Sequence, residues 1–115
     1  MKLADLSFAV EQYQLLTDSY YRITAMMNTP TTQVAFVLTS REIDQVSELY
    51  HDIHGRKEKM YRHLGFLETS ILRSNQELVT SNTSVIVALN AVLLASIDRL
   101  TAKIAQLLLN RKSSQ

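Results

Sequence analysis

The stretch SVIVALNAVLLAS, from Ser84 to Ser96, constrains the fold of this chain more than any other segment. Between its two serines only Asn90 is polar. On a helical wheel its large aliphatic side chains share one face, its alanines share the opposite face, and valines and leucines fill the sides. A helix that is apolar on every side is normally buried. The stretch therefore predicts a helix with packing partners on more than one side.

The helix that contains this stretch is expected to run from about Ser84 to Asn110. Its aliphatic face continues to the end, but Asp98, Arg99 and Lys103 make the flank polar again. A membrane span needs about 20 apolar residues. The uninterrupted part is shorter than that, and extending it would bring these three charges into lipid. We therefore expect no membrane span.

The rest of the chain also favours helices. Two glycines and one proline among 115 residues leave few of the turn signals that an all-β fold needs. From about Asp5 to Met27, apolar residues recur at spacings of three and four, and Pro30 is expected to end this first helix in NTPTT. The residues of this face are Leu6, Ala9, Val10, Tyr13, Leu16, Tyr20, Ile23 and Met27.

A second helix is predicted from Ser40 to Val79. Thr39 and Glu42 have the spacing of a capping box at its start. We expect one continuous helix through Gly55, because a heptad-like seam stays in phase across it; a break there would give four shorter helices. The seam consists of Ile43, Val46, Tyr50, Ile53, Lys57, Met60, Leu64, Leu67, Ile71 and Leu78.

Two segments are expected to connect the helices. We interpret QVAFVL, Gln33 to Leu38, as a connector packed across the helices, with an extra helical turn as the alternative. TSNTS, Thr80 to Ser84, is predicted to be a turn, because its side chains offer the backbone local hydrogen bonds. The expected fold is one all-α domain over residues 1–115, with helices at about 5–27, 40–79 and 84–110. It is a long antiparallel helical hairpin with a packed N-terminal helix, a three- to four-helix bundle with coiled-coil-like seams.

Patterns typical of catalytic sites do not occur in the sequence. It has no cysteine, no GxSxG, no glycine-rich phosphate loop and no HExxH. Glu48 and His51 have the Glu-x-x-His spacing of di-iron bundles, but such sites use two copies of it, so we interpret His51 as solvated. We expect no catalytic residue, no metal and no cofactor, and hence a protein that is not an enzyme.

A basic cluster lies in GRKEKMYRH. Arg56, Lys57, Lys59 and Arg62 are its candidates for phosphate contact. Glu58 interrupts the cluster, and the net charge of the chain is only +1. A solvated helix face explains this pattern better than a nucleic-acid site does. We therefore do not expect nucleic acid to be the main partner.

The alanine face of the last helix is the predicted partner-binding site. Three helices in so short a chain cannot easily enclose one of their own members, and small residues let another helix approach closely. We therefore expect a protein partner bound by helix–helix packing, in a homodimer or a heterodimer. The alternative is that this helix is simply the centre of the protein's own bundle. The predicted contact residues are Ala88, Ala91, Val92, Ala95 and Ala102.

The middle of the chain carries a resemblance to a known family. LTSREIDQVSELYHDIHGRKEKMYRHLGFLE is followed by Asn75, Asn82, Asn90 and a leucine-rich helix. From about Leu38 to Leu108 this pattern resembles the FlgN-like chaperones of flagellar and type III export. The resemblance implies a cytosolic, non-enzymatic chaperone that shields a helix of an export substrate, with the helix from Ser84 to Asn110 as its binding element.

The expected location is the cytoplasm. Asp5 and Glu11 interrupt any apolar signal core near the start of the chain, and the lack of cysteine fits a reducing compartment. A small bacterial or phage regulator that binds and inhibits a host protein or a nucleic-acid-binding factor would have the same physical appearance. We keep this regulator as the alternative to a chaperone or adaptor.

Overall fold

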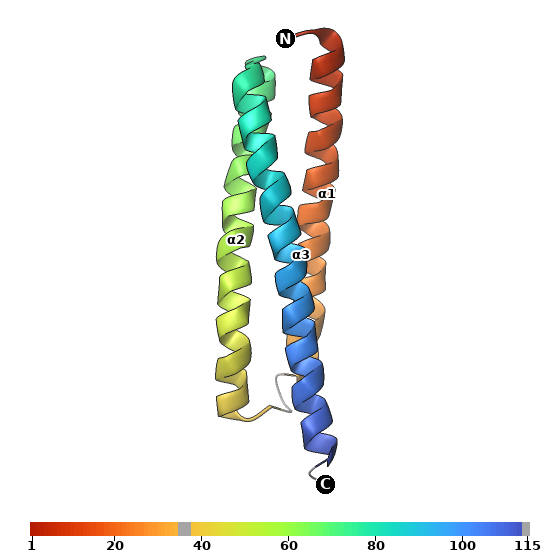
Figure 1. The fold of residues 1–115 in the computed structure, drawn as a ribbon, viewed down its shortest axis with the longest axis vertical. Helices are drawn as coiled ribbons and strands as arrows, with labels where there is room; N and C mark the ends of the chain where they lie inside the picture. The colour runs from red at the N-terminus through yellow and green to blue at the C-terminus, as the bar shows by residue number, and fades with distance from the viewer. Residues whose placement is uncertain (35–37, 114–115) are drawn as a thin grey trace.

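The computed structural model describes residues 1–34 and 38–113, with side chains for residues 1–28 and 38–111. Within these residues there are three helices: α1 from Leu3 to Val34, α2 from Ser40 to Leu72 and α3 from Gln76 to Ser113. They form an elongated bundle of 64 × 18 × 18 Å, in which α2 runs antiparallel to α1 and α3 (Figure 1). The all-α class and the predicted hairpin with a packed N-terminal helix are confirmed.

The start and the continuity of α2 follow the sequence prediction. The Thr39 hydroxyl accepts a hydrogen bond from the Glu42 amide at 3.2 Å, and the Glu42 carboxylate accepts one from the Thr39 amide at 2.9 Å. This is the predicted capping box. The helix then continues through Gly55 and Gly65 without a break. One long helix is therefore confirmed, although each glycine costs about 1 kcal/mol relative to alanine.

The turn between α2 and α3 lies earlier than predicted. The second helix was expected to reach Val79, but α2 ends at Leu72 and the connection is Arg73 to Asn75. Ser74 has a φ of 52°; its amide donates to the Ile71 carbonyl, and the Asn75 amide donates to the Ser70 carbonyl. This is a Schellman ending with serine where glycine is usual. This helix ending could not be recognised from sequence, because no glycine marks the left-handed position.

The predicted turn at Thr80 to Ser84 is wrong, because these residues lie inside α3. Their polar side chains find partners that do not interrupt the helix. The Asn82 amide nitrogen donates to the Leu78 carbonyl at 2.9 Å and to the Ser70 hydroxyl at 3.3 Å. Its oxygen lies 3.0 Å from Nδ1 of His63 on α2, which must be the protonated ring nitrogen if this contact is a hydrogen bond. Asparagine is favourable at this position because Ser70 and His63 of α2 supply hydrogen-bond partners for its side-chain amide.

Helix α1 also extends further than predicted. Pro30 was expected to end it near Met27, but the helix continues to Val34. A proline removes one backbone hydrogen bond and crowds the preceding turn. However, no glycine follows between Pro30 and Val34 that could cap the C-terminus of the helix at an earlier residue. The predicted connector QVAFVL is divided: Gln33 and Val34 are helical, residues 35–37 lie outside the described residues, and Leu38 is half-buried.

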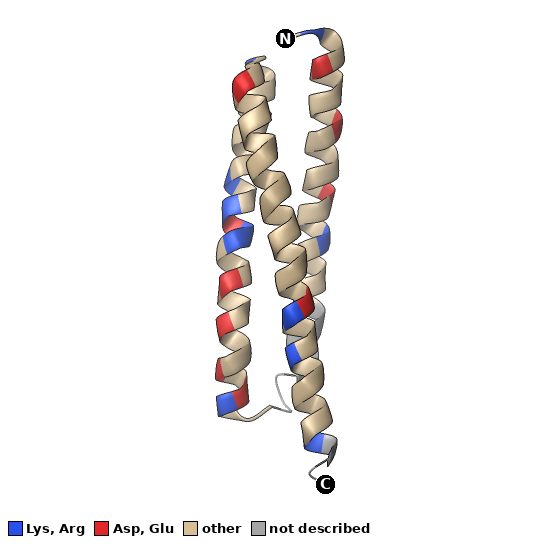
Figure 2. Ribbon diagram, in the orientation of Figure 1, with Lys and Arg blue, Asp and Glu red and all other residues tan. Residues whose placement is uncertain are grey.

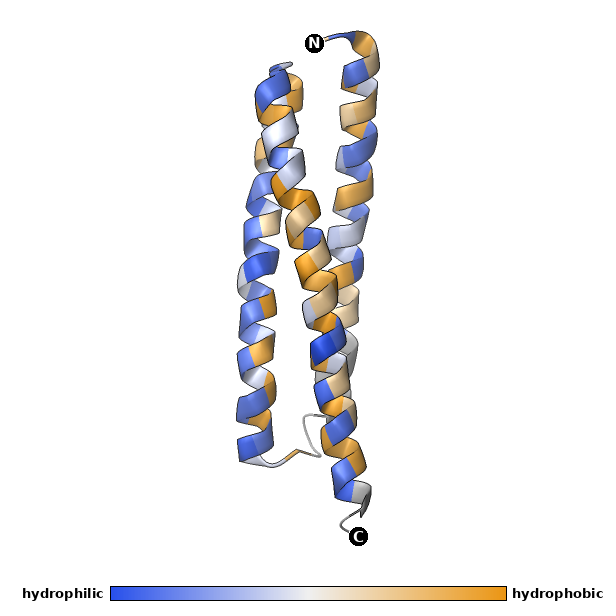
Figure 3. Cartoon of the chain, in the orientation of Figure 1, coloured by the Kyte–Doolittle hydropathy of each residue, from blue (hydrophilic) through white to orange (hydrophobic). Residues whose placement is uncertain are grey.

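Charge and hydropathy are distributed differently on the three helices. Charged residues occur along the length of α2, whereas on α3 a long uncharged stretch separates Glu77, near its start, from the charged residues that begin at Asp98 (Figure 2). The middle of α3 is mostly hydrophobic in Figure 3, while α2 alternates between hydrophilic and hydrophobic residues. Only α2 therefore has the usual charged side of a surface helix along its whole length.

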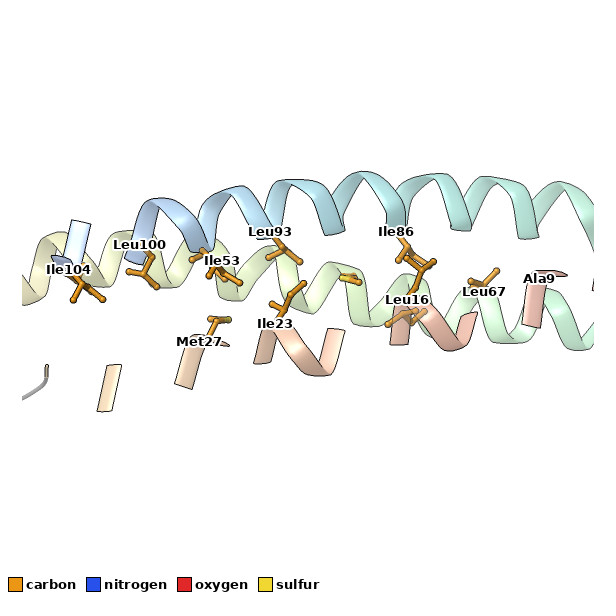
Figure 4. Close-up of a cluster of buried hydrophobic side chains, with 14 of the residues drawn as sticks. Ala9, Leu16, Ile23, Met27, Ile53, Leu67, Ile86, Leu93, Leu100 and Ile104 are labelled. Atoms are coloured by element: carbon orange, nitrogen blue, oxygen red, sulfur yellow. The ribbon is translucent and has the colours of Figure 1, made fainter. Parts of the chain in front are cut away.

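The core is a column of apolar side chains along the bundle axis. Figure 4 shows side chains of Leu16, Ile23, Leu67, Ile86 and Leu93 meeting between the three helices. Full burial of one such side chain contributes about 1.5–3 kcal/mol. The buried apolar residues are Ala9, Leu16, Ile23, Met27, Val46, Ile53, Met60, Leu64, Leu67, Ile71, Val79, Ile86, Leu93, Ile97, Leu100, Ile104 and Leu107.

This core agrees with the predicted faces except at their edges. Val10 and Ile43 were assigned to the apolar faces but are exposed. Leu78 was assigned to the seam of the second helix; it lies in the first turn of α3 and is exposed. Lys57 is half-buried, with its ammonium over the ring of Tyr20. The deviations at Ile43 and Leu78 occur at helix ends, where a neighbouring helix covers less of the surface.

Candidate functional site

The side of α3 that points away from the other helices is apolar and uncovered. We call Val87, Ala88, Ala91, Val92, Leu94 and Ala95 the outward face of α3; all six are exposed. Val87 is 49% exposed and Leu94 39%, although both are large aliphatic residues. Four predicted partner-binding residues, Ala88, Ala91, Val92 and Ala95, thus lie together on one open surface. An apolar surface of this kind is typical of an interaction site.

Ala102 was predicted as part of the same site but lies beyond its apolar part. It is exposed, and so are Asp98 and Arg99 on the turn before it. These charges separate Ala102 from Ala95 along the helix. The site that the bundle presents is therefore shorter than the predicted one and ends near Ser96.

The polar residues within the apolar stretch turn toward the other helices. Asn90 is half-buried and accepts a hydrogen bond from the Ser19 hydroxyl of α1 at 2.5 Å. Asn82 is buried against α2. Burial of a polar group is tolerated when it is hydrogen-bonded. These two asparagines therefore favour the rotation of α3 that keeps the aliphatic residues Val87, Val92 and Leu94 outside.

The corrected boundary of α3 bears on the expectation that it does not span a membrane. Residues 78–97 contain no charged side chain, and the helix from Gln76 to Arg111 is long and apolar enough to cross a membrane by length and composition. Only 22% of its most apolar window is buried in the bundle. The core helix of a soluble protein can pass the same test, so the absence of a span stays a prediction.

The four basic residues of the cluster on α2 differ in their contacts. The Arg56 Nε lies 3.4 Å from the Asp52 carboxylate. The Lys57 ammonium lies 5.2 Å from the ring centre of Tyr20 on α1, while Lys59 and Arg62 are exposed. Two of the four predicted phosphate contacts therefore already have intramolecular partners.

The histidines form no metal site among residues with described side chains. No group of three His, Cys, Asp or Glu side chains there could hold a metal ion. His51 is exposed, as predicted. His54 lies 3.3 Å from the Glu58 carboxylate, one turn along α2, and His63 contacts Asn82 on α3.

Sequence reasoning missed an aromatic cleft between α1 and α2. The cleft has a volume of about 200 Å³, and its lining includes Tyr13, Tyr20 and Tyr21 of α1 and Tyr61 of α2. Four of the five tyrosines in the chain thus lie together. Tyr13 and Tyr20 had been assigned to the apolar face of the first helix, since aromatic residues at helical spacing are usually core. The signal that could have revealed the cleft was the adjacent pair at positions 20 and 21, which cannot both face one core.

Two tyrosines of the cleft, Tyr13 and Tyr20, have a raised pKa and keep their hydroxyl protons to higher pH than usual. Burial, followed by the negative charge of Glu68, raises the pKa of Tyr13, whose hydroxyl donates to the Glu68 carboxylate at 3.3 Å. Burial also raises the pKa of Tyr20, with Tyr61 as the next cause. At neutral pH the Tyr13 and Tyr20 rings are therefore neutral phenols, in a cleft that Glu68 also lines.

Comparison with known proteins adds no assignment to either surface. The chain matches no family model, no curated protein and no solved structure.

Proposed function

We propose that this protein is a non-enzymatic chaperone or adaptor that binds a helix of another protein along the outward face of α3. The observation that carries the proposal is the exposure of Val87, Val92 and Leu94 beside three alanines, on a helix without charge from residue 78 to residue 97. Ordinary surface helices place charged or polar residues on that side. A partner that removes these side chains from water would account for the exception.

The shape of this face fits a helix. Ala88, Ala91 and Ala95 recur at spacings of three and four, so they form a shallow strip between the larger Val92 on one side and Val87 and Leu94 on the other. Small side chains reduce the distance at which two helix axes can pack. The uncharged segment of 20 residues is about 30 Å long. A partner helix of similar length could lie along it.

A membrane is a poorer occupant for the folded bundle. If α3 left the bundle to enter lipid, Asn82 would lose its contacts with Ser70 and His63, and Asn90 would lose Ser19. Two asparagines would then need new partners where no water is present. The folded bundle instead offers one apolar strip to a partner while these contacts stay intact.

The partner class is proposed from the resemblance to FlgN-like chaperones between Leu38 and Leu108. It suggests a cytosolic protein that covers a helix of an export substrate until delivery. A regulator that inhibits a host protein would use the same face, and the identity of the bound protein distinguishes the two.

The test is Ala95→Glu, with Ala105→Glu as the matched control. Both alanines are exposed on α3, but Ala105 lies in its charged half. Each substitution should change the free energy of unfolding by no more than about 0.5 kcal/mol. We expect Ala95→Glu alone to abolish partner binding, because an unpaired glutamate in the contact would have to be desolvated.

The measurement is co-purification from the native host with mass spectrometry, alongside light scattering of the pure protein. An export component retained by the wild type and Ala105→Glu, but lost from Ala95→Glu, supports the chaperone. RNA polymerase or a transcription factor with the same dependence supports the regulator. A stable dimer of the pure protein that Ala95→Glu dissociates would assign the face to a second copy. Equal binding by all three proteins would refute a role for the face.

A further inference from the structure

The aromatic cleft lies on the opposite side of the bundle from the outward face of α3. In a bundle of three helices, the seam between α1 and α2 faces away from α3. Tyr21 and Tyr61 remain 63% and 61% exposed there. The rings of Tyr20 and Tyr61 are 5.6 Å apart and inclined at 41°, and Tyr21 meets Tyr20 edge to face at 5.5 Å. The cleft is thus walled by ring faces and edges that remain accessible to a ligand.

An internal cation already occupies one of these ring faces. The Lys57 ammonium lies 5.2 Å from the centre of the Tyr20 ring, a distance typical of a cation–π contact. Tyrosine rings attract cations through the negative potential of their faces. The contact shows that the tyrosine rings of the cleft can bind a positively charged group.

A carboxylate at the same cleft lacks a cationic partner. Glu68 accepts a hydrogen bond from Tyr13, but it makes no ion pair with any residue whose side chain the structure describes. By contrast, the carboxylate of Glu58, also on α2, lies 3.3 Å from the imidazole of His54. A cation in the cleft would meet aromatic faces and an uncompensated negative charge together.

The absence of a side chain helps to keep the cleft open. Gly65 of α2 lines it, and a Cβ added at this position would meet no atom within 4 Å. The backbone at Gly65 is ordinary helix, so its conformation does not require glycine. A larger residue there would improve helix propensity but would extend into the cleft.

We propose that this cleft binds the guanidinium group of an arginine side chain presented by another polypeptide. A guanidinium stacks on aromatic rings and directs paired N–H donors toward a carboxylate. Glu68 can accept from those donors while Tyr20 or Tyr61 contacts the guanidinium plane. A quaternary ammonium would use the rings but has no N–H for Glu68. The site requires no contact with α3 and is independent of the function proposed above.

Binding can be tested on the intact protein with its own tyrosines as the reporter. The chain has no tryptophan, and four of its five tyrosines line the cleft, so tyrosine fluorescence reports mainly on this site. The probe is the peptide acetyl-Gly-Arg-Gly-amide, with ionic strength held constant by sodium chloride. We expect a saturable fluorescence change, and amide NMR shifts centred on Gly65 and Glu68.

Neutral and quaternary probes decide whether a guanidinium is recognised. The same peptide with citrulline keeps the shape but lacks the charge, and we expect it to give no saturable signal. Tetramethylammonium chloride should bind more weakly than the arginine peptide. Equal binding of the citrulline peptide or of tetramethylammonium would overturn the assignment, as would the absence of any saturable signal with the arginine peptide.

Two glycine substitutions separate blocking of the cleft from effects on folding. Gly65→Leu should abolish arginine-peptide binding, while Gly55→Leu should preserve it. A Cβ at Gly55 also meets no atom within 4 Å, but Gly55 does not line the cleft. Both variants should remain folded by circular dichroism, because both replace a helical glycine by a better helix former. Unchanged binding by folded Gly65→Leu would place the ligand elsewhere.

Charge substitutions give opposite expected changes in affinity. Glu68→Gln should weaken arginine-peptide binding about tenfold, because it removes the charge from the accepting carboxylate. Lys57→Met keeps an unbranched apolar side chain but removes the internal cation, and should strengthen binding about two- to fivefold. If Lys57→Met weakened binding, the lysine would be part of the binding surface and not its internal competitor.

Discussion

Helices α2 and α3 form the two arms of one hairpin but differ on the sides that they turn outward. They have 33 and 38 residues and share the most extensive contact in the bundle. The outward side of α2 carries exposed charges, among them Asp44, Glu48 and Lys59. The corresponding side of α3 carries no charge between Glu77 and Asp98.

This difference separates the requirements of the core from those of the surface. Ile53 of α2 and Leu93 of α3 are both fully buried, so the two helices supply the same kind of inward residue. Because α2 does so with a charged outward side, packing of the hairpin does not require an uncharged outward side on α3. The composition of that side therefore calls for an explanation outside the fold, and the proposed partner helix supplies one.

The largest expected effect compares two neighbours on α3. Leu93 is fully buried, so Leu93→Ala should lower the free energy of unfolding by about 2–5 kcal/mol. Val92 is 36% exposed, and Val92→Ala should change it by less than about 0.5 kcal/mol. Urea unfolding followed by circular dichroism measures both. A similar large loss for Val92→Ala would mean that the outward face is covered in solution, which would remove the contrast with α2.

The inward contrast was predictable from sequence because it depends on helical spacing alone. The three- and four-residue recurrence identified Leu16 and Ile53 as inward residues, and both are buried. The capping box at Thr39 was predictable for a similar reason, since its two hydrogen bonds join residues only three positions apart. Local geometry was sufficient in both cases.

The predictions that depended on contacts between helices were less successful. The sequence from Thr80 to Ser84 is typical of a turn. In the structure it is helical, and Asn82 contacts Ser70 and His63 on the other arm of the hairpin. The real turn uses a left-handed Ser74, which any of several serines in the sequence could have supplied. The first error arises because the hydrogen-bond partners of Asn82 lie on another helix. The second arises because Ser74 adopts a backbone conformation that is uncommon for serine.

The candidate sites were predictable to different degrees. The outward face of α3 follows from one helical wheel, and only Ala102 falls outside its apolar part. The cleft needs Tyr20 and Tyr61 to meet although they lie far apart in the chain, which requires the register between α1 and α2. The register between two helices cannot be derived from a single sequence. The tyrosines alone therefore did not indicate a site.

An intermediate effect is expected where α2 and α3 are joined by polar groups. Asn82→Ala should lower the free energy of unfolding by about 1–3 kcal/mol, because it leaves polar groups of His63 and Ser70 without this partner. Ser81→Ala, at an exposed neighbouring position, should have an effect below about 0.5 kcal/mol. Urea unfolding compares them directly. Equal values would show that water replaces the lost contacts, and that the hairpin is held by its apolar residues alone.

The smallest expected effect concerns the point where the end of α3 meets the start of α2. Hydrogen bonds from the backbone and then the side chain of Thr39 lower the pKa of Glu42, and the nearby positive charge of Arg111 contributes less. The Arg111 guanidinium lies 3.1 Å from the Glu42 carboxylate. A pKa below the ordinary 4.5 means that ionised Glu42 stabilises the fold. That contribution is fully present above the ordinary pKa and is lost as the pH falls through the folded value.

The relative contributions of the cap and the ion pair can be measured by NMR titration of the Glu42 carboxyl carbon. Thr39→Ala removes the hydroxyl of the cap, and Arg111→Gln removes the charge supplied by α3. We expect both substitutions to raise the pKa of Glu42. The rise should be larger in Thr39→Ala, because the hydrogen bond of the Thr39 side chain lowers this pKa more than the charge of Arg111 does, although the backbone hydrogen bond at residue 39 is kept. A larger rise in Arg111→Gln would mean that α3 contributes more than the cap to the charged state of this end of α2. The two arms of the hairpin would then be electrostatically dependent on each other at this end, although they differ in charge along their outward sides.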